Sequence, residues 1–255
     1  MALILNIDTA LETASISLAD QGHVLTAESN ESQKDHAAWI QSAIERLIKS
    51  VHRDLREIKA IGISHGPGSY TGLRIGLATA KGLCYALGIP LVIVNTLALL
   101  AFDAITKVEH GSLQLFSNNE SPAEAFLVTV AGVDIGKILF CPMIDARRME
   151  VFTAVYDRHL TEIIQPQACT LTSSLFEELF KRQKILFLGN GSKKFQQVGQ
   201  HIDNAIFKNF PLNPSALVTI IYRDFIGNNF AGLAYTEPLY LKEPYAVKKA
   251  ELKKT

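Results

Sequence analysis

Apolar side chains follow two different periods along the first 105 residues. Short apolar runs and alternating stretches predict strands, because successive residues of a strand point to opposite faces of a sheet. Residues 34–51 instead carry apolar side chains at steps of three and four, which predicts an amphipathic helix with Asp35 as its cap. The predicted elements are strands at 2–7, 13–19, 23–28, 55–63 and 89–94, and helices at 34–51 and 95–105.

A similar succession of short strands and helices returns in the second half of the chain. It follows a polar stretch at 107–124, which predicts a long loop or an insertion. The predicted elements are strands at 125–133, 137–144, 151–156 and 185–188, and helices at 171–180, from Lys193, and at 216–232. Two tandem units of the type βββαβα indicate an internal duplication.

Residues 61–88 join a buried strand to a long apolar helix through the sequence GPGSYTG at 66–72. The glycines and the proline predict a sharp turn, and Ser69 or Thr71 can cap the helix. One interpretation is a phosphate cradle at the helix N-terminus. The other is a tight strand-to-helix corner with a close helix–helix contact, and the absence of a Gly-Lys-Ser/Thr ending favours it.

Composition narrows the class of protein. The chain has 255 residues, 25 basic and 25 acidic side chains, and three cysteines that are far apart. Balanced charge gives no general sign of nucleic-acid or membrane binding, and the cysteines indicate neither a disulfide framework nor a zinc site. The first residues lack the features of a signal peptide, and no apolar stretch is long enough to cross a membrane. We therefore expect a cytoplasmic protein.

The opening strands carry a candidate phosphate-binding loop. Three antiparallel strands with Asp8 at the end of the first resemble the ribonuclease-H-like half of the actin, hexokinase and Hsp70 superfamily. Asp8, Thr9 and Thr13 occupy the phosphate-loop position of that superfamily, which makes them candidates for contacting a nucleotide. An aspartate at a strand end also caps turns, so a structural role is the alternative.

Four separated segments resemble the TsaB family, also called YeaZ, in family order. They are ILNIDTALETASISLA, GPGSYTGLRIGLATAKGL, IDARRMEVFTAVYD and EPLYLKEPYAVKK. The resemblance implies an α/β fold of two tandem ribonuclease-H-like lobes, which we place at 1–104 and 105–255. Residues 107–136 are longer than expected for the family and mark a possible insertion, and the lysine-rich end is expected to be a mobile basic tail.

The resemblance also implies a function and partners. TsaB-like proteins are non-catalytic accessory subunits that bind the catalytic paralogue TsaD and support threonylcarbamoyl transfer to adenosine 37 of tRNA. A TsaE-like ATPase belongs to the same machinery, and tRNA binds through the complex. Homodimers of TsaB-like proteins use a surface that overlaps the contact with TsaD. No cofactor is expected to be tightly bound, although ATP or ADP can lie at the partner interface.

The same resemblance places the partner contact on a bundle of helices from the first lobe. Gly72, Gly76 and Ala80 lie on one face of the helix that follows the corner, where little side-chain bulk would let another helix approach. The alternative is that this face packs on helix 34–51 within the chain. The residues predicted to form the partner interface are Ile40, Ile44, Gly72, Leu73, Arg74, Gly76, Leu77 and Ala80.

The residues argue against this chain being the catalyst. TsaD-like proteins carry Asn-His-x-x-x-His after the strand that follows the Gly-Pro-Gly corner, and a metal needs both imidazoles. Here Thr96 and Leu100 stand where those histidines would be, and none of the seven histidines forms an HxxxH pair. We therefore predict no catalytic residues, no metal site and no independent enzyme activity.

Two other functions remain open at this point. The first is a stand-alone ATP-dependent enzyme of the same superfamily, or a metallopeptidase-like hydrolase. The second is a homodimeric scaffold for another client. Residues 145–148, with the sequence Asp-Ala-Arg-Arg, open the second hairpin and are candidates either for ion pairing between the lobes or for contact with tRNA or a partner.

Overall fold

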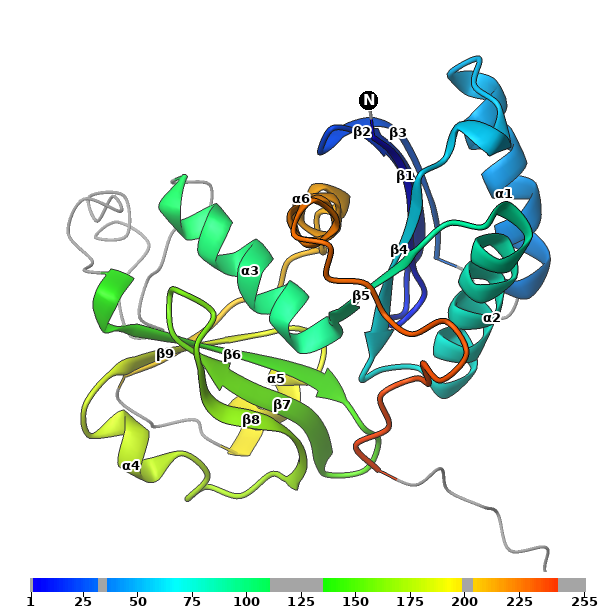
Figure 1. Ribbon diagram of the computed structural model, residues 1–255. Helices are drawn as coiled ribbons and strands as arrows, with labels where there is room; N and C mark the ends of the chain where they lie inside the picture. The colour runs from blue at the N-terminus through cyan, green and yellow to red at the C-terminus, as the bar shows by residue number, and fades with distance from the viewer. Residues whose placement is uncertain (1, 32–35, 111–134, 199–203, 243–255) are drawn as a thin grey trace, which may run out of the picture.

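The computed structural model describes residues 2–31, 36–110, 135–198 and 204–242, and it contains two five-stranded sheets. Figure 1 shows them as two lobes, one on each side of the central helices α3 and α6. The predicted strand at 125–133, the proposed cap Asp35, most of the insertion at 107–136 and the basic tail from 243 lie outside the described residues. None of the helices in the described ranges is both long and apolar enough to cross a membrane.

The first lobe has its sheet in the order β3-β2-β1-β4-β5, with β1, β2 and β3 antiparallel and β4 and β5 parallel to β1. Its strands are β1 Leu3–Asp8, β2 Ala14–Asp20, β3 His23–Asn30, β4 Ala60–Gly66 and β5 Leu91–Asn95. Its helices are α1 His36–Ser50, α2 Tyr70–Leu87 and α3 Thr96–Glu109, with a short 3-10 helix η1 at Leu55–Glu57. η1 takes the first part of the strand predicted at 55–63, so β4 begins only at Ala60.

The second lobe repeats this arrangement strand for strand. Its sheet has the order β8-β7-β6-β9-β10, again with three antiparallel strands followed by two parallel ones. Its strands are β6 Ile138–Asp145, β7 Glu150–Tyr156, β8 Glu162–Thr170, β9 Lys184–Leu188 and β10 Ala205–Phe207. Its helices are α4 Glu177–Phe180, α5 Ser192–Val198 and α6 Pro214–Ile226, preceded by η3 Ile135–Lys137. The predicted fold class and the duplication are thus confirmed.

Caps explain where the main helices begin and end. The Ser69 side chain accepts a hydrogen bond from the Gly72 N–H at the start of α2, and the left-handed Gly88 ends that helix. The Asn95 side chain accepts from the backbone N–H groups of Leu97 and Ala98 at the start of α3. α3 runs to Glu109 rather than ending at 105, because its apolar stripe continues through Val108.

Several sequence predictions for the second lobe are wrong. β8 and β10 were not predicted, because β8 is an edge strand with Pro166 inside it and β10 has only three residues. The helix predicted at 171–180 begins only at Glu177, after a turn in which Phe176 takes the left-handed conformation. The helix predicted at 216–232 ends at Ile226, shortly before the left-handed Asn228.

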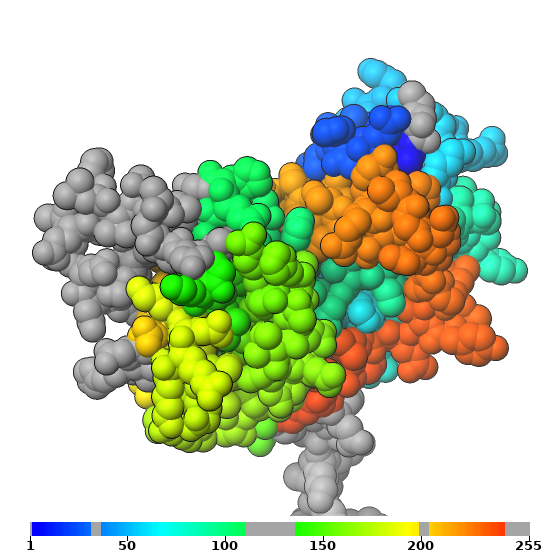
Figure 2. Space-filling model, turned by 60° about the vertical axis from the view of Figure 1, so that its left-hand side comes forward, coloured from blue at the N-terminus to red at the C-terminus, as the bar shows by residue number. Residues whose placement is uncertain are grey.

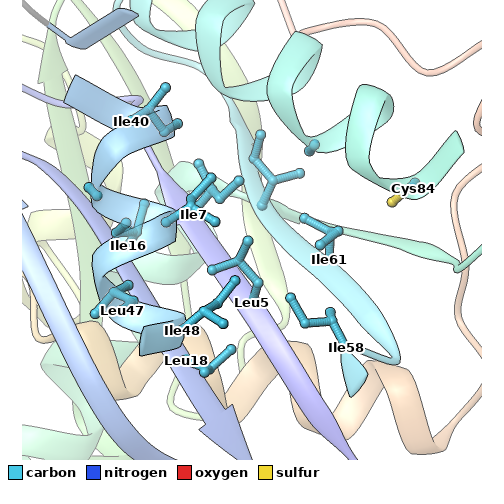
Figure 3. Packing of buried hydrophobic residues seen from close by; sticks show 14 of the residues in the cluster. Leu5, Ile7, Ile16, Leu18, Ile40, Leu47, Ile48, Ile58, Ile61 and Cys84 are labelled. Atoms are coloured by element: carbon cyan, nitrogen blue, oxygen red, sulfur yellow. The ribbon is translucent and has the colours of Figure 1, made fainter. Parts of the chain in front are cut away.

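Each sheet is covered on both faces, and the covering helices cross between the lobes. In the first lobe α1 and α2 pack over one face of the sheet, where Ile40, Leu47 and Ile48 meet Leu5 and Ile7 (Figure 3). α6, from the end of the second half, covers the other face of this sheet. α3, from the first half, packs on the second sheet. The lobe boundary predicted at 104/105 therefore falls inside α3.

The chain after α6 returns along the first lobe. The Ala231 N–H donates to the Leu91 carbonyl, and the Leu239 N–H donates to the His65 carbonyl, both at 2.8 Å. Lys242 then forms an ion pair with Glu150 of the second lobe. We call residues 230–242 the strap; Figure 2 shows this orange-to-red segment on the surface, reaching from the first lobe to the green second lobe.

Candidate functional site

A cleft of about 470 Å³ lies where the two lobes and the strap meet. We call it the interlobe cleft. It is lined by residues 10–12 and 67–71 of the first lobe, by 144–147, Phe152 and Asn190 of the second, and by 239–242 of the strap. Its volume is in the range of small-molecule sites. Of the three predicted nucleotide contacts, Asp8, Thr9 and Thr13, none lines the cleft.

Asp8 and Thr9 hold the fold together instead of facing the cleft. The Asp8 carboxylate is buried and accepts hydrogen bonds from the Ser64 hydroxyl at 2.5 Å and from the Ala10 N–H at 3.0 Å. Burial raises the pKa of this carboxyl, and the two hydrogen bonds oppose the rise only in part. Thr9 is fully buried and donates its hydroxyl proton to the Gly72 carbonyl at 2.7 Å. Thr13 is exposed.

The GPGSYTG turn is a tight corner rather than a phosphate cradle. The Ser69 N–H donates to the Ala10 carbonyl at 2.7 Å, and the Ser69 side chain accepts a hydrogen bond from the Gly72 N–H. A Cβ added at Gly68 would lie 2.2 Å from the Ala10 carbonyl oxygen, so the loop after β1 packs directly on this corner. The N–H groups of Ser69 and Gly72 are therefore bonded within the chain, whereas those of Tyr70 and Thr71 have no acceptor among the described residues.

The second lobe repeats the aspartate turn of the first at the opposite wall of the cleft. Asp145 ends β6 as Asp8 ends β1, and its carboxylate accepts the Arg147 N–H at 2.6 Å, as Asp8 accepts the Ala10 N–H. Unlike Asp8, Asp145 is exposed and forms an ion pair with Lys194. The Asn190 side chain accepts the Asp145 N–H and also donates to Glu12 of the first lobe at 3.3 Å.

The residues predicted to form a partner interface are almost all internal. Ile40, Ile44, Gly72, Leu73, Gly76, Leu77 and Ala80 are buried within the chain, and Arg74 is exposed. At its glycines the small face of α2 meets the sheet: a Cβ at Gly76 would lie 2.3 Å from the Thr9 hydroxyl oxygen and 3.3 Å from the Ile63 side chain. Ala80 of the same face packs in one core cluster with residues of α1. The glycines therefore let α2 approach the end of β1, and the expected packing on helix 34–51 within the chain is found at Ala80.

The opposite side of α2 is open. Ala78, Gly82 and Tyr85 follow one another at helical steps and are exposed, and Tyr85 retains 85% of its accessible surface. A Cβ at Gly82 would meet no described atom within 4 Å. We call these three residues the outer stripe of α2. A glycine and an exposed tyrosine on a helix surface are not explained by packing within the described chain.

The segment that would hold two metal-binding histidines is part of the interior. Asn95 caps α3, Thr96 is fully buried without a described hydrogen-bond partner for its hydroxyl, and Leu100 packs in the core of the second lobe. Among the residues that the structure describes, no group of three or more His, Cys, Asp or Glu side chains is placed to hold a metal ion.

Two tyrosines and an arginine form a cluster at the mouth of the cleft. Tyr70 at the start of α2 and Tyr240 of the strap have ring centroids 5.2 Å apart at an angle of 35°. The Arg74 guanidinium lies 4.2 Å from the centroid of the Tyr70 ring, and its Nε donates to the Tyr240 hydroxyl at 3.0 Å. Sequence reasoning missed this cluster, because Tyr240 is 166 residues from Arg74 and only the return of the strap joins them.

Known proteins resemble the chain in sequence and in fold. The family model described as TsaD, tRNA N6-adenosine threonylcarbamoyltransferase, matches residues 7–115. The tRNA threonylcarbamoyladenosine biosynthesis protein TsaB of Bacillus subtilis (strain 168) is 27% identical over 76% of this chain and 74% of its own length. The protein of that name from Escherichia coli (strain K12) is 25% identical over 96% of this chain and 97% of its own. YeaZ from Pseudomonas aeruginosa has the same fold, with a TM-score of 0.70 at 19% identity over 94% of this chain and all of that one.

Proposed function

The chain belongs to the TsaB (YeaZ) family, and on this premise we propose that it serves threonylcarbamoyladenosine formation in tRNA as an accessory subunit rather than as the catalyst. The names of the relatives supply the pathway. The observation that supports the accessory role is a contrast within the first lobe. The loop after β1 is covered by α2, while the outer stripe of α2 is exposed to solvent.

The sealed side supports the lack of catalysis. A catalytic carboxylate must reach its substrate. Asp8 instead lies under the corner, hydrogen bonded to Ser64 and Ala10. Thr96 and Leu100 replace the imidazole pair that the resemblance associates with the catalytic paralogue, and both side chains are buried.

The exposed outer stripe of α2 supports binding to a partner whose first lobe has the same fold as that of this chain. The family model of the threonylcarbamoyltransferase matches residues 7–115, which include the end of β1, β2 to β5 and α1 to α3. Two proteins with the same first lobe can pair through equivalent helices about an approximate two-fold axis. A second copy of this chain would use the same surface, so a homodimer and the complex with the catalytic paralogue should compete.

The outer stripe of α2 fits such a helix pair. Ala78 and Gly82 leave room for a helix backbone to approach, and Tyr85 adds a large ring at the end of the stripe. We place the contact on these three residues in place of the buried ones predicted from the sequence. ATP or ADP at this contact and a TsaE-like ATPase in the assembly complete the proposal.

Reconstitution tests the function directly. Threonylcarbamoyladenosine in tRNA would be measured with the TsaD-like, TsaC-like and TsaE-like proteins of the same organism, with and without this chain. We expect the product to depend on the chain and the chain alone to make none. Product formation that is indifferent to the chain would refute the proposal.

Variants at one position test the contact. Gly82→Arg should weaken binding to the TsaD-like protein at least tenfold in calorimetric titration, because the long cation would stand between the helices. Gly82→Ala is the matched control and should bind within about threefold of the wild type, since it adds only a methyl group. Equal binding by wild type and Gly82→Arg would place the contact elsewhere.

A further inference from the structure

The hairpin between β6 and β7 presents two consecutive arginines in an unfavourable backbone conformation. Arg147 and Arg148 have φ angles of 67° and 51°, where glycine and asparagine are the usual residues. The turn is closed by hydrogen bonds from the Ala146 N–H to the Glu150 carbonyl and from the Glu150 N–H to the Arg147 carbonyl. The backbone therefore holds both arginines at the exposed tip of the hairpin, where residues better suited to the turn could stand.

Arg147 is the cation available at the cleft. It lines the interlobe cleft, it is exposed, and its guanidinium has no partner among the described residues. The other cationic side chain of the lining, Lys242, is paired with Glu150, and Asp145 is paired with Lys194. Glu12 is the remaining lining carboxylate, and it is hydrogen bonded to Asn190.

The facing wall offers aromatic surface. Tyr70 and Tyr240 both line the cleft, and each keeps 37% of its surface accessible. Arg74 fixes the pair by lying over one ring and bonding the hydroxyl of the other. Rigid, partly exposed aromatic rings that line the same cleft as a free guanidinium are a combination that binds an unpaired nucleotide, because the base stacks and the phosphate meets the cation.

Several backbone N–H groups of the cleft lining are already bonded within the chain. The N–H groups of Ser69 and Gly72 at the start of α2 are bonded to the Ala10 carbonyl and to the Ser69 side chain. The N–H groups of Ala10, Asp145 and Arg147 in the two aspartate turns are bonded to side chains. A ligand should therefore bind mainly through the two tyrosine rings and the Arg147 guanidinium, to which the N–H groups of Tyr70 and Thr71 can add.

We propose that the mouth of the interlobe cleft binds an unpaired nucleotide of an RNA strand, with the base on Tyr70 and Tyr240 and the phosphodiester on Arg147. The inference deepens the proposed function, on which it rests for the choice of RNA as the ligand. It gives the chain its own contact with the RNA, separate from the outer stripe of α2.

Fluorescence anisotropy with labelled hexa-adenylate RNA and the isolated chain tests the site. Arg147→Gln should weaken binding about fivefold and reduce the slope of log affinity against log salt by about one, because one phosphate contact is lost. Tyr70→Leu and Tyr240→Leu should each weaken binding about tenfold and leave the slope unchanged, because stacking releases no counterions. Arg158→Gln is the matched control: Arg158 is exposed beyond the far end of β7 and should not matter.

Two further arms decide the ligand class. A blunt-ended RNA duplex and AMP should compete at least tenfold more weakly than unlabelled hexa-adenylate, since the duplex offers no unpaired base and AMP offers no strand. Binding that is undetectable, that is equal for all variants, or that AMP matches would overturn the proposal. The assay uses no partner protein, so RNA binding can persist if the chain proves dispensable for threonylcarbamoyladenosine formation, and the two failures are distinguishable.

Discussion

At the scale of single residues, the glycines of α2 show both the strength and the limit of sequence reasoning. Their spacing correctly predicts one helix face without bulk. It cannot reveal what fills the space, because the neighbour is Thr9, 67 positions before Gly76 in the chain. The end of β1 fills the space beside the glycines, and α1 packs next to it. The helix α2 carries a third glycine, Gly82, that faces outward.

This difference between two glycines gives a stability prediction. Gly76→Ala should lower the free energy of unfolding by about 2 kcal/mol, because its Cβ would overlap the Thr9 hydroxyl oxygen. Gly82→Ala should raise it by about 0.5–1 kcal/mol, because alanine favours the helix and the space is open. Urea denaturation measures both, and equal effects would contradict the packing described here.

Asp8 gives a prediction in pH. The pKa of its carboxyl is raised in the folded chain above the ordinary value of 3.8, so the folded state keeps this proton to a higher pH than the unfolded state. The carboxyl therefore lowers stability increasingly as pH rises from 3.8 through the raised pKa, and by a constant amount above it.

Asp8→Asn removes that titration while keeping an acceptor for the Ala10 N–H. We expect the free energy of unfolding of the variant to increase relative to wild type as pH rises from about 4 towards about 7, as measured by urea denaturation at each pH. The comparison cancels groups that titrate alike in both chains. A difference that stays constant over this range, or one that falls, would contradict the burial of an ionisable carboxyl.

At the scale of elements, the strap is the feature that local pattern could not locate. Residues 230–242 contain few periodic apolar positions, so the sequence predicts only an end segment after α6. The structure ties the strap to α2 through the Lys81 ammonium group, which donates to the carbonyls of Ala234 and Thr236 at 3.2 and 3.1 Å. By contrast, the helix predicted at 34–51 is found as α1 at His36–Ser50, because its buried positions recur over several turns.

Loosening the strap should expose it to proteolysis. Tyr235, between the two anchoring carbonyls, keeps 92% of its surface accessible. Lys81→Met should therefore increase the rate of chymotrypsin cleavage at Tyr235 by about three- to tenfold, because two charge-assisted hydrogen bonds are lost. Lys49→Met, on the exposed side of α1, is the control. Unchanged cleavage in Lys81→Met would show that Lys81 does not restrain the strap.

At the scale of the whole molecule, two copies of one strand order are joined by exchanged helices. The repeat of strands and helices made the duplication predictable from the sequence. The exchange was not predictable, because the apolar pattern of α3 or α6 shows that one face is buried but does not indicate which sheet that face packs against. Since α6 packs on β1 to β5 and α3 on the second sheet, each half of the chain depends on the other for a buried face.

A half-chain experiment follows from this exchange. A fragment of residues 1–110 lacks α6, so the face formed by Ile4, Val92 and Val94 would be open to water. We expect the fragment to aggregate, or to lose at least half of the free energy of unfolding of the full chain in urea. A fragment as stable as the full chain would mean that the first lobe folds independently of α6.

In the function that we propose, this chain acts through a partner rather than through chemistry of its own. The most direct measurement is the rate of threonylcarbamoyladenosine formation in tRNA as the chain is titrated against a fixed amount of the TsaD-like protein. An accessory subunit predicts a rate that rises until the two proteins are roughly equimolar and then levels off. A rate that saturates when the chain is far below the amount of the TsaD-like protein would contradict the account, because only a catalyst turns over in that way.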